Sequence, residues 1–134
     1  MQQIIIDGVE YILTLKLQTE KPEVVYNDWR LPTIEELATL IDYTRYEPAS
    51  FLKDTVSGYY WSATTYAGST DSVWVVYFGN GNQYGNGNKT NGNYVRCVRD
   101  SEHGLQWTKS YEKMTWYEDI EFAKTLIAPA YHSL

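Results

Sequence analysis

The stretch from Tyr59 to Arg99 constrains this chain most, because its composition is unusual for a plain hydrophobic core. It holds six of the nine glycines, six of the seven asparagines and eight of the eighteen Tyr and Trp residues, but only four charged side chains. Tyr and Trp offer a broad contact area with few rotatable bonds, and Gly, Ser and Asn offer adaptable hydrogen bonding, as in the loops of binding proteins. We therefore interpret the stretch as a recognition surface rather than a catalytic one.

The chain has 134 residues, which predicts a single domain over residues 1–134 with a sizeable core. Its net charge is −6 and Lys and Arg do not cluster, so we expect no nucleic-acid partner. The single cysteine, Cys97, excludes an intrachain disulfide. The amino terminus lacks the features of a signal peptide and no long apolar run follows, so we expect no membrane insertion. We expect folding in the cytoplasm, and leave open whether the final location is there, on a virion or on a cell surface.

Two capping boxes predict two helices. Thr33 with Glu36 begins the first, and Thr115 with Glu118 begins the second. Apolar residues recur at helical spacing after each box and predict one buried face per helix. These faces consist of Ile34, Leu37, Leu40 and Ile41 in the first helix, and of Ile120, Ala123 and Ile127, with Trp116 near the start, in the second.

The other segments favour short strands, which makes the whole an α+β pattern. Residues 3–17 place two β-rich runs around an Asp-Gly pair and predict a hairpin. Residues 73–78 alternate between two faces, of which we assign the heavier one to the core. For residues 79–93 we predict a hairpin with positive-φ turns and a long mobile tip. Residues 94–99 predict the next strand, and residues 104–107 predict a short strand or a turn.

Searches for catalytic and metal-binding motifs find little. The sequence has no nucleophile elbow, phosphate-binding loop, zinc-protease helix or calcium loop. Asp28, Arg30 and Glu35 could suggest an acid/base site, but we favour a local ion-pair cluster that fixes a loop to the first helix. His103 and His132 lie in polar segments, where we expect them to face solvent. We expect no cofactor and no metal.

Four motifs of the chain resemble the C-terminal domain family of the collagen-like adhesin Lcl. Members of this family occur in bacteria and phages. The motifs are DWRLPTIEEL at 28–37, YYWSATTYA at 59–67, VWVVYF at 73–78 and YVRCVR at 94–99. The resemblance covers about residues 26–127. It implies a C-type-lectin-like fold, in which two helices flank a small, twisted, mostly antiparallel sheet with a long Gly/Asn-rich hairpin loop. Members include adhesins and variable proteins diversified by retroelements, in which the Asn-rich segment is hypervariable and binds the ligand.

The resemblance also implies which side chains lie inside and which bind. It places Trp61, Trp74, Val76 and Phe78 in the core, and it turns Val75, Tyr77 and Gly79 outward. The ligand-binding residues that we expect on this basis are Thr64, Tyr66, Val75, Tyr77, Gly79, Asn80, Asn82, Tyr84, Asn86, Asn88, Asn91 and Asn93.

The sequence differs in three features from the Lcl family and from other families with the lectin-like fold. The segment GLQW…TWYEDIEFAKTL usually precedes the first motif, but here it occupies 104–126, which indicates circular permutation or, alternatively, the stub of a second repeat. The helix cysteine that can pair with the strand cysteine in the family corresponds here to Ala123, opposite Cys97. The residue sets with which calcium-dependent lectins bind sugars are missing, so we do not expect calcium-dependent sugar binding.

We interpret the chain as a non-catalytic binding protein whose partner is a protein or glycan receptor, as in adhesion or phage receptor binding. A variable protein diversified by a retroelement fits these observations best. Two alternatives stay open. One is a structural tail or surface module whose loop mediates contacts in a homo-oligomer, and the other is an enzyme that uses Asp28, Arg30 and Glu35.

Overall fold

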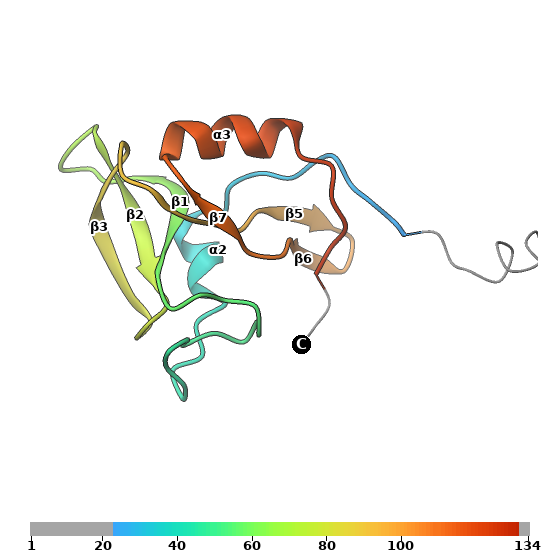
Figure 1. The fold of residues 1–134 in the computed structure, drawn as a ribbon, viewed down its shortest axis with the longest axis horizontal. Coiled ribbons are helices and arrows are strands. Elements are labelled where there is room, and N and C mark those ends of the chain that lie inside the picture. The colour runs from blue at the N-terminus through green and yellow to red at the C-terminus, as the bar shows by residue number, and fades with distance from the viewer. Residues whose placement is uncertain (1–22, 132–134) are drawn as a thin grey trace, which may run out of the picture.

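The structure, a computed structural model, describes residues 23–131 and confirms the α+β class (Figure 1). The hairpin predicted at 3–17 lies outside the described residues. The helices are α2 (Ile34–Ala38) and α3 (Trp116–Thr125). The strands are β1 (Tyr59–Thr65), β2 (Ser72–Tyr77), β3 (Asn82–Asn88), β4 (Asn93–Val95), β5 (Val98–Ser101), β6 (Gly104–Trp107) and β7 (Tyr111–Met114).

Five of these strands form one sheet in the order β3-β2-β1-β4-β7, and β5 pairs with β6 in a second sheet. The pairings are antiparallel except that of β1 with β4, which is parallel. Among residues 23–131, the strand β3 therefore lies at one edge of the larger sheet, and β7 lies at the other. Within the described residues, no helix is long and apolar enough to span a membrane.

Each face of the five-stranded sheet supports a hydrophobic cluster. Tyr60 and Val76 point into the first cluster, which α2 covers, while their neighbours Trp61 and Val75 point into the second, which includes Ala123 of α3. Alternating side chains of one strand face opposite sides of a sheet, so one strand serves both clusters. The predicted core positions Trp61, Val76 and Phe78 are confirmed as fully buried.

The expectation that Val75 and Gly79 face outward is wrong. Val75 is only 2% exposed, because it packs in the second cluster with Val73 and Trp61. Gly79 is buried as well. Trp74, expected in the core, is only partly buried at the margin of the first cluster. The period of two identified the two faces of β2 correctly, but it could not show that the second face is also covered.

About half of the Gly/Asn-rich segment 79–93 forms the strand β3, so the segment is not one long loop. The strand β3 pairs with β2 along its length, from Tyr77 opposite Asn82 to Ser72 opposite Asn88. Within 79–93 only Gly81 has a positive φ, at 85°. The expectation that Gly and Asn residues supply positive-φ turns is therefore confirmed at Gly81 and wrong for the asparagines. Some support turns through their side chains instead, since Asn88 Oδ1 accepts hydrogen bonds from the backbone N–H and the hydroxyl of Thr90.

Both predicted capping boxes are confirmed. Thr33 Oγ1 accepts from the Glu36 N–H at 3.1 Å and Glu36 Oε1 accepts from the Thr33 N–H at 2.9 Å, and Thr115 forms the same pair of bonds with Glu118. The apolar face predicted after Thr33 is buried, although α2 itself ends at Ala38 and its last two members lie beyond it. Ile127 is exposed, so its assignment to the buried face of α3 is wrong.

The C-terminal segment forms one wall of the same domain. β6 pairs with β5 and β7 pairs with β4, and Tyr26 forms an antiparallel bridge with Ala128. The prediction of a strand at 104–107 is confirmed. Ala123 joins the buried cluster that contains Cys97, as the helix position of the family implies. Residues 104–131 therefore contribute to the core rather than hanging from it.

Candidate functional site

Three tyrosines from three adjacent strands meet at one end of the five-stranded sheet. Tyr59 begins β1, Tyr77 ends β2 and Tyr84 lies in β3. The ring centroid of Tyr59 lies 4.7 Å from that of Tyr77 and 6.1 Å from that of Tyr84. Tyr59 is 44% exposed and the other two are half-buried. We call Tyr59, Tyr77 and Tyr84 the tyrosine cluster.

The turn between β2 and β3 adds amide groups beside the tyrosine cluster. Asn82 Nδ2 donates to the hydroxyl of Tyr84 at 3.2 Å, and Asn80 Oδ1 accepts from the backbone N–H of Asn82 at 2.9 Å. Gly79 supports the ring of Tyr77, since a Cβ at this position would collide with the ring carbons. Of the predicted residues, Tyr77, Asn80, Asn82 and Tyr84 thus lie together, with Gly79 beneath them.

The analysis of the sequence missed two highly exposed tyrosines beside this turn. Tyr43 and Tyr46 are 72% and 77% exposed and lie on the loop that follows α2. The loop is tied to the turn, because Glu47 N–H donates to Gly79 O at 3.0 Å. Tyr43 also lies next to Gly81. Tyr59 was missed as well. Nothing in the local pattern marks these three side chains, because their exposure depends on how distant segments pack.

Two predicted residues, Thr64 and Tyr66, belong to the other face of the sheet. Thr64 Oγ1 accepts a hydrogen bond from the first N–H of α2, that of Ile34, at 2.9 Å. The ring of Tyr66 packs edge-on against Trp74, with centroids 5.6 Å apart, and lies over Gly85. Thr64 therefore helps to position α2, and Tyr66 is separate from the tyrosine cluster.

The remaining predicted residues lie toward the opposite end of β3 and the turn after it. Asn86 and Asn91 are exposed, Asn93 is half-buried and Asn88 stabilises the turn as described. This turn is held by α3, since Trp116 N–H donates to Lys89 O at 3.1 Å and the Lys89 ammonium lies 4.6 Å from the indole centroid. The structure thus divides the predicted set into three groups rather than one surface.

The prediction that Asp28, Arg30 and Glu35 form one cluster is wrong. Arg30 pairs with Glu36 at 2.8 Å and with Asp100 at 3.2 Å, whereas Asp28 pairs with Arg99 at 2.6 Å. Each arginine holds the pKa of its partner, Glu36 or Asp28, below the usual range. Glu35 is exposed and forms no ion pair within the described residues. The pair of Arg30 with Glu36 does fix the preceding loop to α2.

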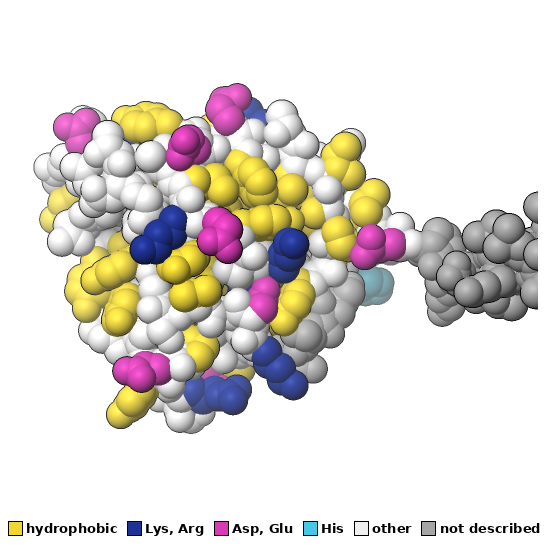
Figure 2. Space-filling model, in the orientation of Figure 1, with side chains coloured by type: hydrophobic (Ala, Val, Ile, Leu, Met, Phe, Trp, Pro, Cys, Tyr) yellow, Lys and Arg dark blue, Asp and Glu magenta, His cyan; other side chains and the backbone are white. Residues whose placement is uncertain are grey.

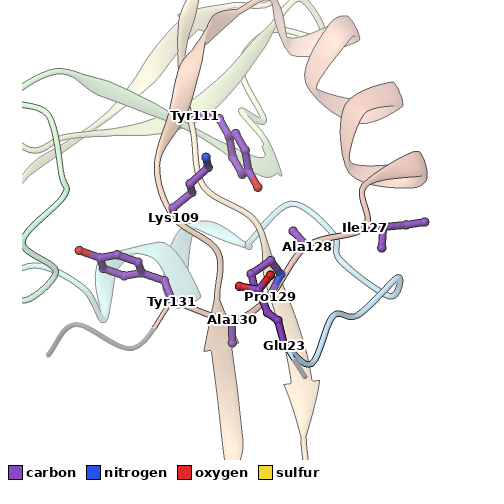
Figure 3. Close-up of a pocket in the computed structure, with 8 residues that line it drawn as sticks. All are labelled: Glu23, Lys109, Tyr111, Ile127, Ala128, Pro129, Ala130 and Tyr131. Carbon is purple, nitrogen blue, oxygen red and sulfur yellow. The ribbon is translucent and has the colours of Figure 1, made fainter. Parts of the chain in front are cut away.

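A cavity of about 540 Å³ lies away from these groups, beside the C-terminal stretch (Figure 3). Lys109 and Tyr111 line one side, and residues 127–131 and Glu23 line the rest. The Lys109 ammonium lies 5.3 Å from the ring centroid of Tyr111. None of the predicted binding residues lines this cavity.

Within the described residues, no group of three His, Cys, Asp or Glu side chains lies close enough together to hold a metal ion. His103 is exposed, as predicted, and His132 lies outside the described range. Two buried ionisable groups, Arg96 and Asp119, were missed. Asp119 on α3 is fully buried, and desolvation raises the pKa of its carboxyl to about 8.

The fold and the tyrosine cluster together define a small α+β domain that displays aromatic and amide side chains on a sheet with two cores. Hydrophobic side chains gather on the surface over β2 and β3 and again beside α3 (Figure 2). The sequence profile of the Lcl C-terminal domain matches residues 9–99, which is more than half of the chain. The chain belongs to this adhesin-associated family, as its four motifs predicted.

The match differs in extent from the predicted region. It begins at residue 9 rather than about residue 26, and it ends at residue 99. The strands β6 and β7 and the helix α3 lie beyond it. No curated protein and no solved structure matched the chain.

Proposed function

We propose that the chain is a non-catalytic ligand-binding domain that presents the tyrosine cluster to a protein or glycan receptor. The observation that supports this most is the arrangement of Tyr59, Tyr77 and Tyr84, three partly exposed rings on three neighbouring strands. Rings held on paired strands lose little freedom on binding, so less of the contact energy is lost to ordering. Tyr43 and Tyr46 extend the contact area on the adjoining loop.

The chemistry of this surface favours neutral contacts. Between Tyr59 and Asn88 the only charged side chain is Asp71. Tyrosine rings pack on apolar side chains or on the C–H faces of sugars, and their hydroxyl groups and the amide of Asn82 provide hydrogen bonds. Salt screens charge pairs, so we expect binding at this surface to weaken only modestly at high ionic strength.

We further propose that the chain is one of the diversified variable proteins of its family. Asn82, Gln83, Asn86 and Asn88 of the edge strand β3 are exposed, so their side chains are not required to fill either cluster. Val75 and Gly79, by contrast, support the surface from within. The direct test is the genomic neighbourhood, where a reverse transcriptase and an imperfect repeat of the segment encoding residues 60–99 should occur. A neighbourhood lacking both would contradict diversification while leaving ligand binding intact.

Binding itself is tested with a glycan array and a panel of displayed receptor proteins as probes, followed by affinity measurements on the best probe. Tyr77→Ala and Tyr84→Ala should each lower affinity about tenfold or more, because aromatic anchors are frequent hot spots. Tyr117→Ala, an exposed tyrosine on α3, is the matched control and should leave affinity unchanged. A probe whose binding ignored both cluster tyrosines, or vanished with a chelator, would overturn the proposal.

One observation favours a second candidate, a contact between copies of this chain. Among the described residues the strand β3 lies at the edge of the sheet, and none of its seven residues is charged. Natural edge strands are commonly protected by charged residues or proline, which prevent pairing with another strand. Light scattering across a range of concentrations distinguishes the two candidates, and a strictly monomeric protein would exclude this one.

A further inference from the structure

Asp119 is a buried carboxyl group that has no hydrogen-bond partner among residues 23–131. It is 1% exposed, and neither of its oxygens accepts or donates a hydrogen bond within the described residues. It lies on α3, one helical turn before the buried Ala123. An ionised carboxylate in such surroundings is unfavourable, so the neutral form is preferred there. Burial accordingly raises the pKa of Asp119 from 3.8 to about 8.

The groups that face Asp119 do not compensate a negative charge. Cys97 lies close enough for Asp119 to raise the pKa of its thiol further, beyond the effect of burial. Tyr111 of β7, whose pKa is also raised by burial, packs in the same hydrophobic cluster as Cys97, and both side chains are neutral at pH 7. Burial is the only influence that shifts the pKa of Asp119, so no cation among the described residues offsets its charge.

The first turn of α3 is connected to the strands of the larger sheet. Trp116 Nε1 donates to Ser62 O of β1 at 3.0 Å, and its backbone N–H donates to Lys89 O at 3.1 Å. In Figure 1 this end of α3 lies beside the connection between β3 and β4. A displacement of α3 would therefore release the turn that contains Asn91, one of the exposed candidates for ligand contact.

We propose that Asp119 is a proton-dependent latch, whose neutral carboxyl keeps α3 seated on the sheet and whose ionisation loosens α3 together with the turn 89–92. The latch itself is a property of the fold. Only its effect on ligand binding rests on the proposed function. The folded pKa lies above the unfolded value, so the latch is fully closed below about pH 4 and weakens as the pH rises toward 8.

The test is amide hydrogen exchange of the whole chain between pH 5 and pH 8, corrected for the intrinsic pH dependence of exchange. In the wild type, opening of α3 and of residues 89–92 should increase by up to about tenfold per pH unit, the limit for one linked proton. Asp119→Asn, which cannot ionise, should remove this dependence. Glu121→Gln is the matched control, because Glu121 is an exposed carboxylate on the same helix.

Three results would overturn the latch. The first is a flat wild-type profile for α3, and the second is an unchanged pH dependence in Asp119→Asn. The third is an opening free energy of α3 equal to that of β2 at every pH, because this would mean global rather than local unfolding. If Asp119→Asn fails to fold, the wild-type and Glu121→Gln profiles still decide between local opening and none. The experiment uses no ligand, so its outcome is independent of whether the tyrosine cluster binds a receptor.

Discussion

Arg96 connects three segments that lie far apart in the sequence, and its removal gives a demanding test of the fold. The side chain is 1% exposed, although it is charged. Its guanidinium donates to Asp54 Oδ1 at 2.6 Å, to Thr108 O at 2.7 Å and to Thr55 Oγ1 at 3.0 Å. It therefore ties the loop before β1 to the segment between β6 and β7.

We expect Arg96→Ala to lower the free energy of unfolding by about 3–5 kcal/mol, the usual cost of breaking a buried ion pair by removing one partner. The Thr108 carbonyl and the Asp54 carboxylate would each lose a donor. The lower half of this range is favoured, because Asp54 Oδ2 also accepts from the Ser110 N–H at 2.7 Å and the Asp54 side chain is 25% exposed. The total free energy of unfolding of a small domain is only about 5–15 kcal/mol, so this loss is a large part of it.

Urea unfolding followed by tryptophan fluorescence measures this change. Arg45→Ala is the control, because Arg45 is exposed, and it should shift the free energy of unfolding by about 0.5 kcal/mol or less. A double-mutant cycle with Asp54→Ala separates the pair from the other bonds. A loss below about 1 kcal/mol for Arg96→Ala would refute the reasoning, since it would show that the guanidinium is not desolvated as the structure indicates.

Three further predictions concern the core, the pH dependence and the C-terminal segment. Phe78→Ala should cost about 3–5 kcal/mol of unfolding free energy, and Asn86→Ala about 0.5 kcal/mol or less; similar urea midpoints would contradict the assigned faces. From pH 5 toward pH 8, the wild-type unfolding free energy should fall by up to about 1.4 kcal/mol per unit, because the folded pKa of Asp119 is raised; an unaltered slope in Asp119→Asn would exclude this cause. Deleting residues 104–134 should abolish the cooperative thermal transition seen by circular dichroism, because β5 loses its partner β6 and β4 loses β7; a truncated chain that melts like the parent would favour the repeat stub.

Local chemistry made parts of the fold predictable from sequence. A capping box depends on residues three positions apart, so both helix starts were found at Thr33 and Thr115. The period of two separated the faces of β2 in the same way. The family assignment also followed from short motifs, which are local patterns whose order along the chain is specific.

What could not be predicted depends on distant contacts. Val75 is buried because a cluster that includes α3 covers its face, and nothing near Val75 in the sequence indicates this. Gly and Asn have low strand propensity, so residues 82–88 suggested a loop, but pairing with β2 overrides that preference. The tyrosine cluster was found only in part for the same reason, since Tyr59 joins Tyr77 through strand register.

The close packing against β3 limits how the proposed binding surface can evolve. A side chain at Gly87 would place its Cβ 2.6 Å from Val75 Cγ1 and 2.9 Å from the Val73 carbonyl, and Gly81 has a φ that other residues rarely adopt. Asn82, Gln83 and Asn86 face solvent and have no such restriction. Positions that tolerate change and positions that favour glycine therefore alternate between residues 81 and 88. We expect any library or natural mechanism that diversifies this segment to keep the fold best when Gly81 and Gly87 stay glycine.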